Sequence, residues 1–290
     1  MFRDRMKSAI AGGVLAALAT LPAPAAPIGV TEVDVKLVIA TDVSKSISDT
    51  EAKLQRDGIA DVFLEPEVVK AIQSGQLGRI AIAMVDWSSD QHVMLDWTIV
   101  KDAASAAALS EKIRVLPRVP GERTSISGAL ERSFALLNQS DVSIVAEKKV
   151  VDVSGDGPNN DGNAMQEAHD KTIAQGIVVN GLPVMDDNAN GYYPDLDKYY
   201  AGCVVGGRGA FVIVVRSFKD FGAAMRHKLI LEVSQNETQI RQVLDEMEKN
   251  RLFKRAAAGP GANNGPEVLR PGQNEYSKNC DRNGFGFGGF

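Results

Sequence analysis

The sequence has little sulfur and little imidazole, with two cysteines and three histidines in 290 residues. The cysteines, Cys203 and Cys280, lie far apart, and His92, His169 and His227 show no ligand spacing and no pairing with a nucleophile. This pattern argues against a zinc site. Ser44 and Ser154 also lack the G-x-S-x-G frame around a nucleophile, which argues against a serine hydrolase.

Basic runs are also missing. Lys and Arg number 32 against 37 Asp and Glu, a formal net charge of −5, so we expect no nucleic acid as the main partner. After the N-terminal region, no apolar segment is long enough to span a bilayer. The apolar content of 44% nevertheless predicts a sizeable core.

The N-terminal region has the pattern of a cleavable signal peptide. Three basic residues in "MFRDRMK" precede the short apolar run "SAIAGGVLAALATL", and Ala23-Pro24-Ala25 fits the small-residue cleavage rule. We expect residues 1–25 to be removed after Ala25, which takes away three positive charges and one negative and changes −5 to about −7. The alternative is a membrane anchor. The prediction is a periplasmic or secreted protein, in which an oxidising environment favours a disulfide between Cys203 and Cys280.

Buried strands alternate with helical segments along most of the chain. "DVKLVIATDVS", "RIAIAMVDW", "KKVVDVSGDG", "IVVNGLPV" and "FVIVVRSF" are continuous apolar strands, and "HVMLDWTIV" is expected beside the second of them. Helical periodicity follows the first strand over 47–75, with Ser48 or Asp49 as the cap, and a later helix is expected to begin near Thr124. The alternation predicts a single α/β domain with a doubly wound, mostly parallel sheet flanked by helices.

The C-terminal part of the chain has a different composition. Residues 234–258 predict a charged helix that is exposed or weakly docked. Residues 259–290 are rich in Gly, Asn and Pro, and we expect them to be disordered apart from a tether at Cys280.

Three polar segments are expected at one edge of this sheet. Asp42, Ser44 and Ser46 follow the first strand, Thr124 lies at the start of a helix, and Asp156 follows the "VVDVSG" strand. In a doubly wound sheet, ligands bind at the carboxyl ends of the strands, where strand order reverses. Two carboxylates and three hydroxyls form an oxygen ligand set suited to a hard cation such as Mg²⁺ or Mn²⁺.

These segments resemble the von Willebrand factor A domain family over roughly residues 33–233. Asp42-Val43-Ser44-Lys45-Ser46 matches its D-x-S-x-S motif, and Thr124 and Asp156 match the other two parts of its metal-ion-dependent adhesion site. The resemblance implies that Ser44 and Ser46 bind the metal directly and that Asp42 and Asp156 bind it directly or through water. Thr124 would join in the ligand-competent state, and a Glu or Asp from a partner protein would complete the site. Within the family, the chain is similar to exported bacterial members.

Other interpretations of the same residues remain open. Ser44, Ser46 and Thr124 also suit helix caps, and Asp156-Gly157 suits a turn, in a domain without a metal. A metal-dependent hydrolase would need a general base, for which Asp86 and Asp152 are the candidates. Asp152 lies among apolar neighbours and, if buried, needs a partner such as a backbone group or a hydroxyl; we do not expect it to bind the metal. Asp86 and Trp87 are expected to line the binding face, with a place in the core as the alternative for Trp87.

Two further loops invite a ligand interpretation. Residues 186–197, "DDNANGYYPDLD", place oxygen side chains at several positions of a calcium loop, but with Asp197 in place of the final Glu and without flanking helices. A polar loop is the preferred interpretation, with Ca²⁺ as the alternative. "GCVVGGRGAF" matches no phosphate-binding motif and is expected to form a tight turn.

Overall fold

A computed structural model describes residues 29–139, 143–186, 193–258, 267–269 and 280, with side chains left out for 250–258 and 267–269. The predicted signal peptide (1–25) lies outside these residues. One seven-stranded sheet forms the centre, in the order β3-β2-β1-β4-β5-β6-β7. Its strands are β1 Thr31–Asp42, β2 Ile80–Trp87, β3 Gln91–Val100, β4 Ile144–Gly155, β5 Val178–Pro183, β6 Val212–Val214 and β7 Glu267–Leu269.

The sheet is parallel through its five central strands and antiparallel at both edges. β2, β1, β4, β5 and β6 pair in parallel, whereas β3 pairs antiparallel with β2 and β7 with β6. The predicted doubly wound, mostly parallel sheet is therefore confirmed, and the expected neighbour of the second strand is its antiparallel edge partner.

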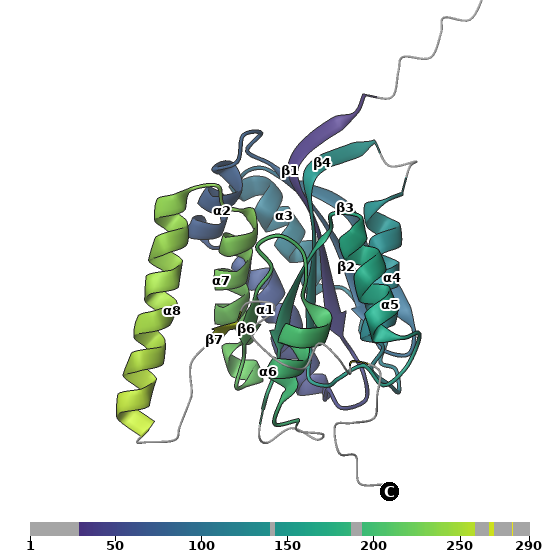
Figure 1. Cartoon of the computed structure of the whole chain (residues 1–290). Coiled ribbons are helices and arrows are strands. Elements are labelled where there is room, and N and C mark those ends of the chain that lie inside the picture. Colours follow the sequence, from purple (N-terminus) through teal and green to yellow (C-terminus); the bar gives the residue numbers. More distant parts are fainter. Residues whose placement is uncertain (1–28, 140–142, 187–192, 259–266, 270–279, 281–290) are drawn as a thin grey trace, which may run out of the picture.

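Helices cover both faces of the sheet (Figure 1). One face packs against α1 Asp49–Val62, α2 Pro66–Gln73, α3 Ala103–Arg114 and α7 Phe221–Val233, and α8 Glu237–Ala258 packs on the outer side of α7 (Figure 1). The other face packs against α4 Ile126–Leu137, α5 Met165–Ala174 and the short α6 Leu196–Tyr199, which runs into a π-helical turn over Tyr200–Val204. Two apolar cores, one on each face, hold the sheet between them.

The helical region after β1 is two helices, not one. Ser48 caps α1 through a capping box with Glu51, as the cap prediction requires. The chain then leaves the helix before Pro66, because proline has no backbone N–H to donate and disfavours helical geometry in the residue before it. Pro66 instead begins α2 at a first-turn position, where a missing N–H costs little. The start near Thr124 is close to the observed one, with Ser125 as the cap of α4.

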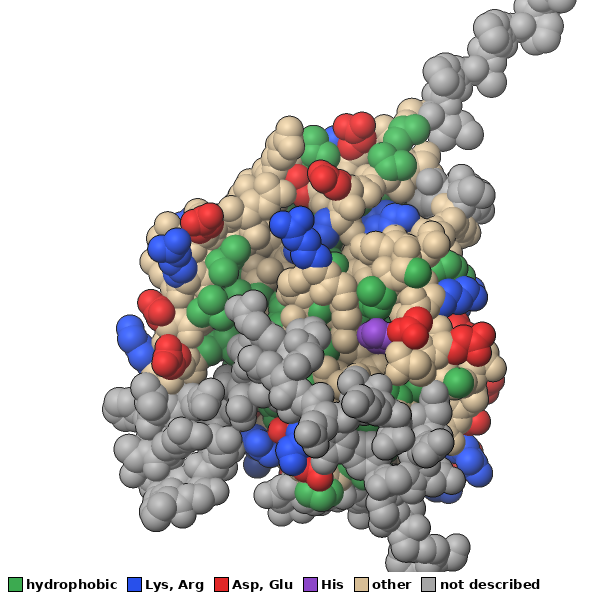
Figure 2. Space-filling view, viewed as in Figure 1, with side chains coloured by type: hydrophobic (Ala, Val, Ile, Leu, Met, Phe, Trp, Pro, Cys, Tyr) green, Lys and Arg blue, Asp and Glu red, His purple; other side chains and the backbone are tan. Residues whose placement is uncertain are grey.

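The C-terminal part packs more closely against the domain than its composition predicts. α8 buries Val243 and Met247 in the core of the α7 face, so this charged helix is docked. Figure 2 shows hydrophobic side chains gathered between α8 and the rest of the domain. Glu267–Leu269 adds the edge strand β7, which corrects the expectation of disorder at these three positions. The rest of the tail lies outside the described residues, Cys280 excepted.

Candidate functional site

The site lies where strand order reverses in the sheet. β1 has β2 on one side and β4 on the other, so the chain winds outward in both directions from the β1–β4 pair. Thr41 pairs with Ser154, which brings the carboxyl ends of β1 and β4 level. Loops leaving these two ends diverge and leave room for a ligand between them. Asp42 and Asp156 stand at this point.

Hydrogen bonds tie the loop after β1 to the loop after β4. The Asp42 Oδ1 atom accepts from the Ser44 backbone N–H at 2.8 Å. The hydroxyls of Ser44 and Ser46 lie 3.2 Å apart, and Ser46 Oγ donates to Asp156 Oδ1 at 2.8 Å. Four of the five expected site residues therefore form one continuous polar chain.

Thr124 reaches the same place from a third loop. Its backbone N–H donates to Asn160 Oδ1 at 2.9 Å, and the Asn160 N–H donates back to the Thr124 carbonyl at 2.8 Å. A Cβ built on Gly157, the residue after Asp156, would lie 3.6 Å from Thr124 Oγ1. The fold thus brings together all five residues that the sequence selected.

Burial makes the two carboxylates costly to ionise. Desolvation, together with the nearby charge of Asp156, raises the pKa of Asp42 to about 8. Desolvation also raises the pKa of Asp156 to about 6, against the lowering effect of the hydrogen bond from Ser46. Asp42 Oδ2 is buried and has no hydrogen-bond partner among the described residues. Two buried acids, one with an oxygen that has no partner among the described residues, are neutralised either by protonation or by a cation.

The donor set fits a small hard cation. Asp42, Ser44, Ser46, Thr124 and Asp156 offer only oxygen atoms, which Mg²⁺ and Mn²⁺ prefer. In the part of the chain that the structure describes, no group of three or more His, Cys, Asp or Glu side chains is placed to hold a metal. A site here therefore depends on its hydroxyls as much as on its carboxylates.

Gly155 and Tyr200 border this site, but no motif in the sequence predicted that they would. A Cβ on Gly155 would lie 2.8 Å from Asp42 Oδ2 and 3.0 Å from Tyr200 Oη, so only glycine leaves these two oxygens room. Tyr200 Oη is itself buried and unpaired within the described structure. Burial and the charge of Asp42 raise the pKa of Tyr200, which keeps the phenol protonated beside the carboxylate.

Both candidate general bases are paired with cationic side chains. Asp86 receives a hydrogen bond from Arg56 Nη2 at 2.5 Å, and Asp152 forms an ion pair with Lys228 Nζ at 2.9 Å. Trp87 is fully buried in the core between the sheet and α4. The partner of Asp152 is a lysine on α7 and not the expected backbone group or hydroxyl, because a buried carboxylate is better compensated by a cation. Trp87 takes the core role of its two alternatives.

The two remaining loops give little support to a ligand site. Residues 187–192 of the calcium candidate lie outside the described residues, and Asp197 lies within α6. Gly207 and Gly209 adopt positive φ angles of 92° and 80° before β6, as a tight turn requires.

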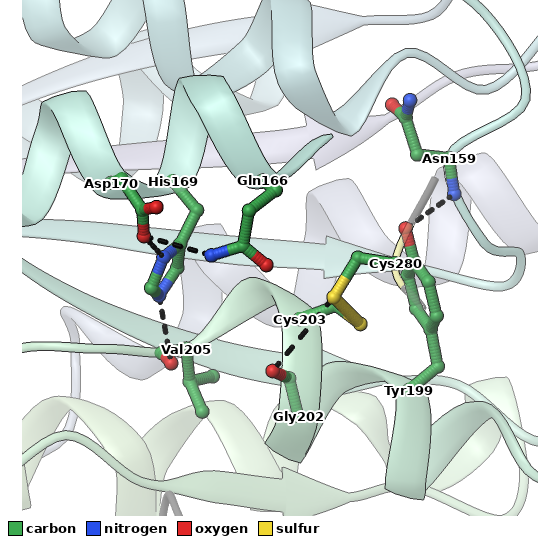
Figure 3. The surroundings of a disulfide bond; sticks show 9 residues. All are labelled: Asn159, Gln166, His169, Asp170, Tyr199, Gly202, Cys203, Val205 and Cys280. Atoms are coloured by element: carbon green, nitrogen blue, oxygen red, sulfur yellow. Dashed lines mark hydrogen bonds and ion pairs between the residues drawn. A yellow bond between two sulfur atoms is a disulfide. The ribbon is translucent and has the colours of Figure 1, made fainter. Parts of the chain in front are cut away.

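A disulfide joins Cys203 to Cys280, with a Cα–Cα distance of 5.5 Å (Figure 3). Cys203 lies in the π-helical turn that also carries Tyr200. Tyr199, one residue before that turn, accepts a hydrogen bond from the Asn159 N–H in the loop after β4, at 3.3 Å. The disulfide therefore fixes Cys280 to a segment that touches the site.

The raised acid pKa values predict a pH-dependent stability for the metal-free protein. Between about pH 4 and pH 8 the folded state retains protons on Asp42 and Asp156 that the unfolded chain releases, so stability falls as pH rises. Since a pKa difference of one corresponds to about 1.4 kcal/mol, we expect the free energy of unfolding in EDTA to fall by at least about 2 kcal/mol from pH 5 to pH 8. Urea denaturation at the two pH values measures this. A stability that rises over this range would contradict it.

Comparisons with known proteins identify the family. A family described as "Protein of unknown function (DUF1194)" matches residues 32–237. The chain belongs to this family. No curated protein matches the sequence. The DUF1194 chain contains no helix, within its described residues, that is long and apolar enough to cross a membrane.

Solved structures share the fold. Proximal thread matrix protein 1 from the mussel byssus matches with a TM-score of 0.52 and 16% identity, over 69% of this chain and 48% of that one. A form of that protein with a zinc-occupied MIDAS motif matches with a TM-score of 0.51, 17% identity, and coverage of 71% and 46%. The pilus adhesin SpaC from Lactobacillus rhamnosus GG matches with a TM-score of 0.50, 13% identity, and coverage of 69% and 30%. The DUF1194 chain thus spans half or less of these proteins, and its von Willebrand factor A-like fold is confirmed.

Proposed function

We propose that this chain is an exported protein-binding module that depends on a divalent cation. Asp42, Ser44, Ser46, Thr124 and Asp156 would hold Mg²⁺ or Mn²⁺, and a partner protein would present an Asp or Glu to the same place. The observation that carries the proposal is the buried, unpaired Asp42 Oδ2 beside Asp156 and three hydroxyls.

The charge balance supports binding of an acidic group. Two protein carboxylates balance the 2+ charge of a bound cation but do not make the centre negative. The cation can therefore still accept a third carboxylate, from a partner, as a further ligand. Ser46 holds Asp156 in place, and the Ser44 N–H fixes the orientation of Asp42. The zinc-occupied MIDAS motif of the mussel protein, which shares this fold, supports a divalent cation here. Calcium in the 186–197 loop stays a separate prediction.

A hydrolytic function receives less support. The candidate bases Asp86 and Asp152 are paired with Arg56 and Lys228, which lowers their readiness to accept a proton. No observation favours this alternative over binding.

Metal removal tests the proposal. In a pull-down from the exported fraction, we expect partner proteins to be retained in Mg²⁺ and lost in EDTA, because the partner's acidic residue then has no cation to bind. Ser46→Ala should lower Mg²⁺ affinity measured by isothermal titration. Ser133→Ala should not, since Ser133 Oγ donates to the Ala129 carbonyl of its own helix, away from the site. Partner retention that survives chelation would contradict the proposal.

A further inference from the structure

The Tyr200 side chain packs against glycines on two neighbouring strands, β4 and β5. A Cβ on Gly181 of β5 would lie 2.7 Å from Tyr200 Cδ1, and a Cβ on Gly155 of β4 would lie 3.0 Å from Tyr200 Oη. Glycine inside a strand weakens the strand and often marks a place where another group approaches the backbone closely. Both strands therefore carry glycine where the tyrosine ring passes, and the ring reaches the end of β4.

The backbone at Tyr200 holds the ring in this direction. Tyr200 begins the π-helical turn that runs to Val204, and its carbonyl accepts from the Val205 N–H at 3.0 Å. Such turns are rare and are frequently found at functional sites. Cys203 lies in the same turn, which is therefore cross-linked to Cys280 as well as hydrogen-bonded. Tyr200 thus projects from a fixed element and not from the loops that carry the proposed cation ligands.

The Tyr200 hydroxyl and one oxygen of Asp42 lie at the same place. Tyr200 Oη and Asp42 Oδ2 are both within 3.0 Å of the position of a Gly155 Cβ, and the third atom there is Cη2 of the Trp87 ring. Both oxygens are buried and have no hydrogen-bond partner among the described residues. The other carboxylate oxygen, Asp42 Oδ1, already accepts from the Ser44 N–H. A phenol donates and a carboxylate accepts, so the two unpaired oxygens are complementary.

A buried hydroxyl without a partner costs free energy, and phenylalanine would fill the same space without that cost. Because buried polar atoms almost always have partners, the hydroxyl of Tyr200 indicates a state of the protein in which it is paired. Asp42 Oδ2 can accept from a phenol and still face a cation, since a carboxylate oxygen has two lone pairs. A bound cation keeps Asp42 ionised, and hydrogen bonds to an ionised acceptor are the stronger ones.

From these contacts we propose that Tyr200 is a positioning residue of the cation site. In the cation-bound state its hydroxyl donates to Asp42 Oδ2 and holds this carboxylate towards the cation. Together with the Ser44 N–H on Oδ1, it fixes both oxygens of Asp42. Tyr200 does not itself bind the cation. This inference rests on the proposed function, because it assigns Tyr200 a role at the same site.

Tyr200→Phe removes only the hydroxyl and tests the proposal in the full chain. We expect Mg²⁺ affinity, measured by isothermal titration, to fall roughly 10-fold, the effect of one hydrogen bond to a charged group. In EDTA we expect the variant to be at least as stable to urea as the wild type, because the hydroxyl has no partner to lose there. A purely structural hydroxyl would give the opposite result, with lower stability in EDTA and unchanged Mg²⁺ affinity, and that result would overturn the proposal.

Ser110→Ala is the matched control. Ser110 Oγ is also buried and unpaired within the described part of the chain, but it lies on α3, which carries none of the proposed ligands. Its removal should leave Mg²⁺ affinity unchanged, and an equal loss in this control would refute a specific role for Tyr200.

The inference and the proposed function fail in different ways. Unchanged Mg²⁺ affinity in Tyr200→Phe, together with lost affinity in Asp42→Asn, would overturn the role of Tyr200 and leave the cation site standing. A wild-type protein that binds no Mg²⁺ would overturn both.

Discussion

Asp42→Asn should abolish Mg²⁺ binding and, at the same time, stabilise the metal-free protein. The amide oxygen can still accept from the Ser44 N–H, but the side chain no longer carries the charge that the cation needs. We expect Mg²⁺ affinity to fall at least about 100-fold, equivalent to about 2.7 kcal/mol. Isothermal titration measures this loss.

The expected stabilisation of the metal-free Asp42→Asn variant follows from the loss of a buried charge. Ionised Asp42 lies in a desolvated place beside Asp156, which is why its pKa is raised. Removing that charge should increase the free energy of unfolding in EDTA at pH 8 by about 1–2 kcal/mol, and should flatten its decline with pH. Asp90→Asn is the control, because Asp90 is an exposed carboxylate in the turn after β2. Unchanged Mg²⁺ affinity in Asp42→Asn would refute the cation site.

Lys228→Met should give the largest loss of stability. Lys228 is fully buried and contacts Asp152 at 2.9 Å and Glu232 at 2.8 Å. Asn180 Nδ2 also donates to Glu232 Oε1 at 2.8 Å. Methionine fills the space but leaves two acids in the core without their cation, which costs about 3–5 kcal/mol. Urea denaturation of the variant at pH 7 measures the loss, with Lys219→Met as an exposed control.

Restoring neutrality should recover most of that loss. In the triple variant Lys228→Met, Asp152→Asn, Glu232→Gln, the acids become amides of nearly the same shape, so no buried charge is left unpaired. The single variant should also lose less stability at pH 5 than at pH 8, because burial raises the pKa of Asp152 to about 7 and the acid is protonated at the lower pH. A triple variant as unstable as the single one would show that packing, not charge, makes Lys228 important.

Local chemistry made much of the molecule predictable from the sequence. Continuous apolar strands alternating with amphipathic helices specify a parallel sheet covered on both faces. That architecture in turn specifies where ligands bind. The segments holding Asp42, Ser44, Ser46, Thr124 and Asp156 were therefore identifiable although more than a hundred residues separate the first from the last.

The docking of α8 and the formation of β7 depend on tertiary contacts that no local sequence pattern predicts. α8 has the composition of a surface helix because it carries as many charged residues as apolar ones, yet Val243 and Met247 pack into the core and help to dock it beside α7. Glu267–Leu269 has the composition of a tail and becomes a strand because β6 presents an unpaired edge.

The sequence by itself determined the fold class and the residues at the strand ends, since hydrophobic period and turn chemistry are local properties. Only the tertiary structure decided that Asp152 meets Lys228, that Tyr200 faces Asp42 across Gly155, and that Arg56 and Arg118 border one pocket. The physical reason is that ion pairs, desolvation and cavities depend on distances between elements. Those distances exist only after the two cores have packed against the sheet.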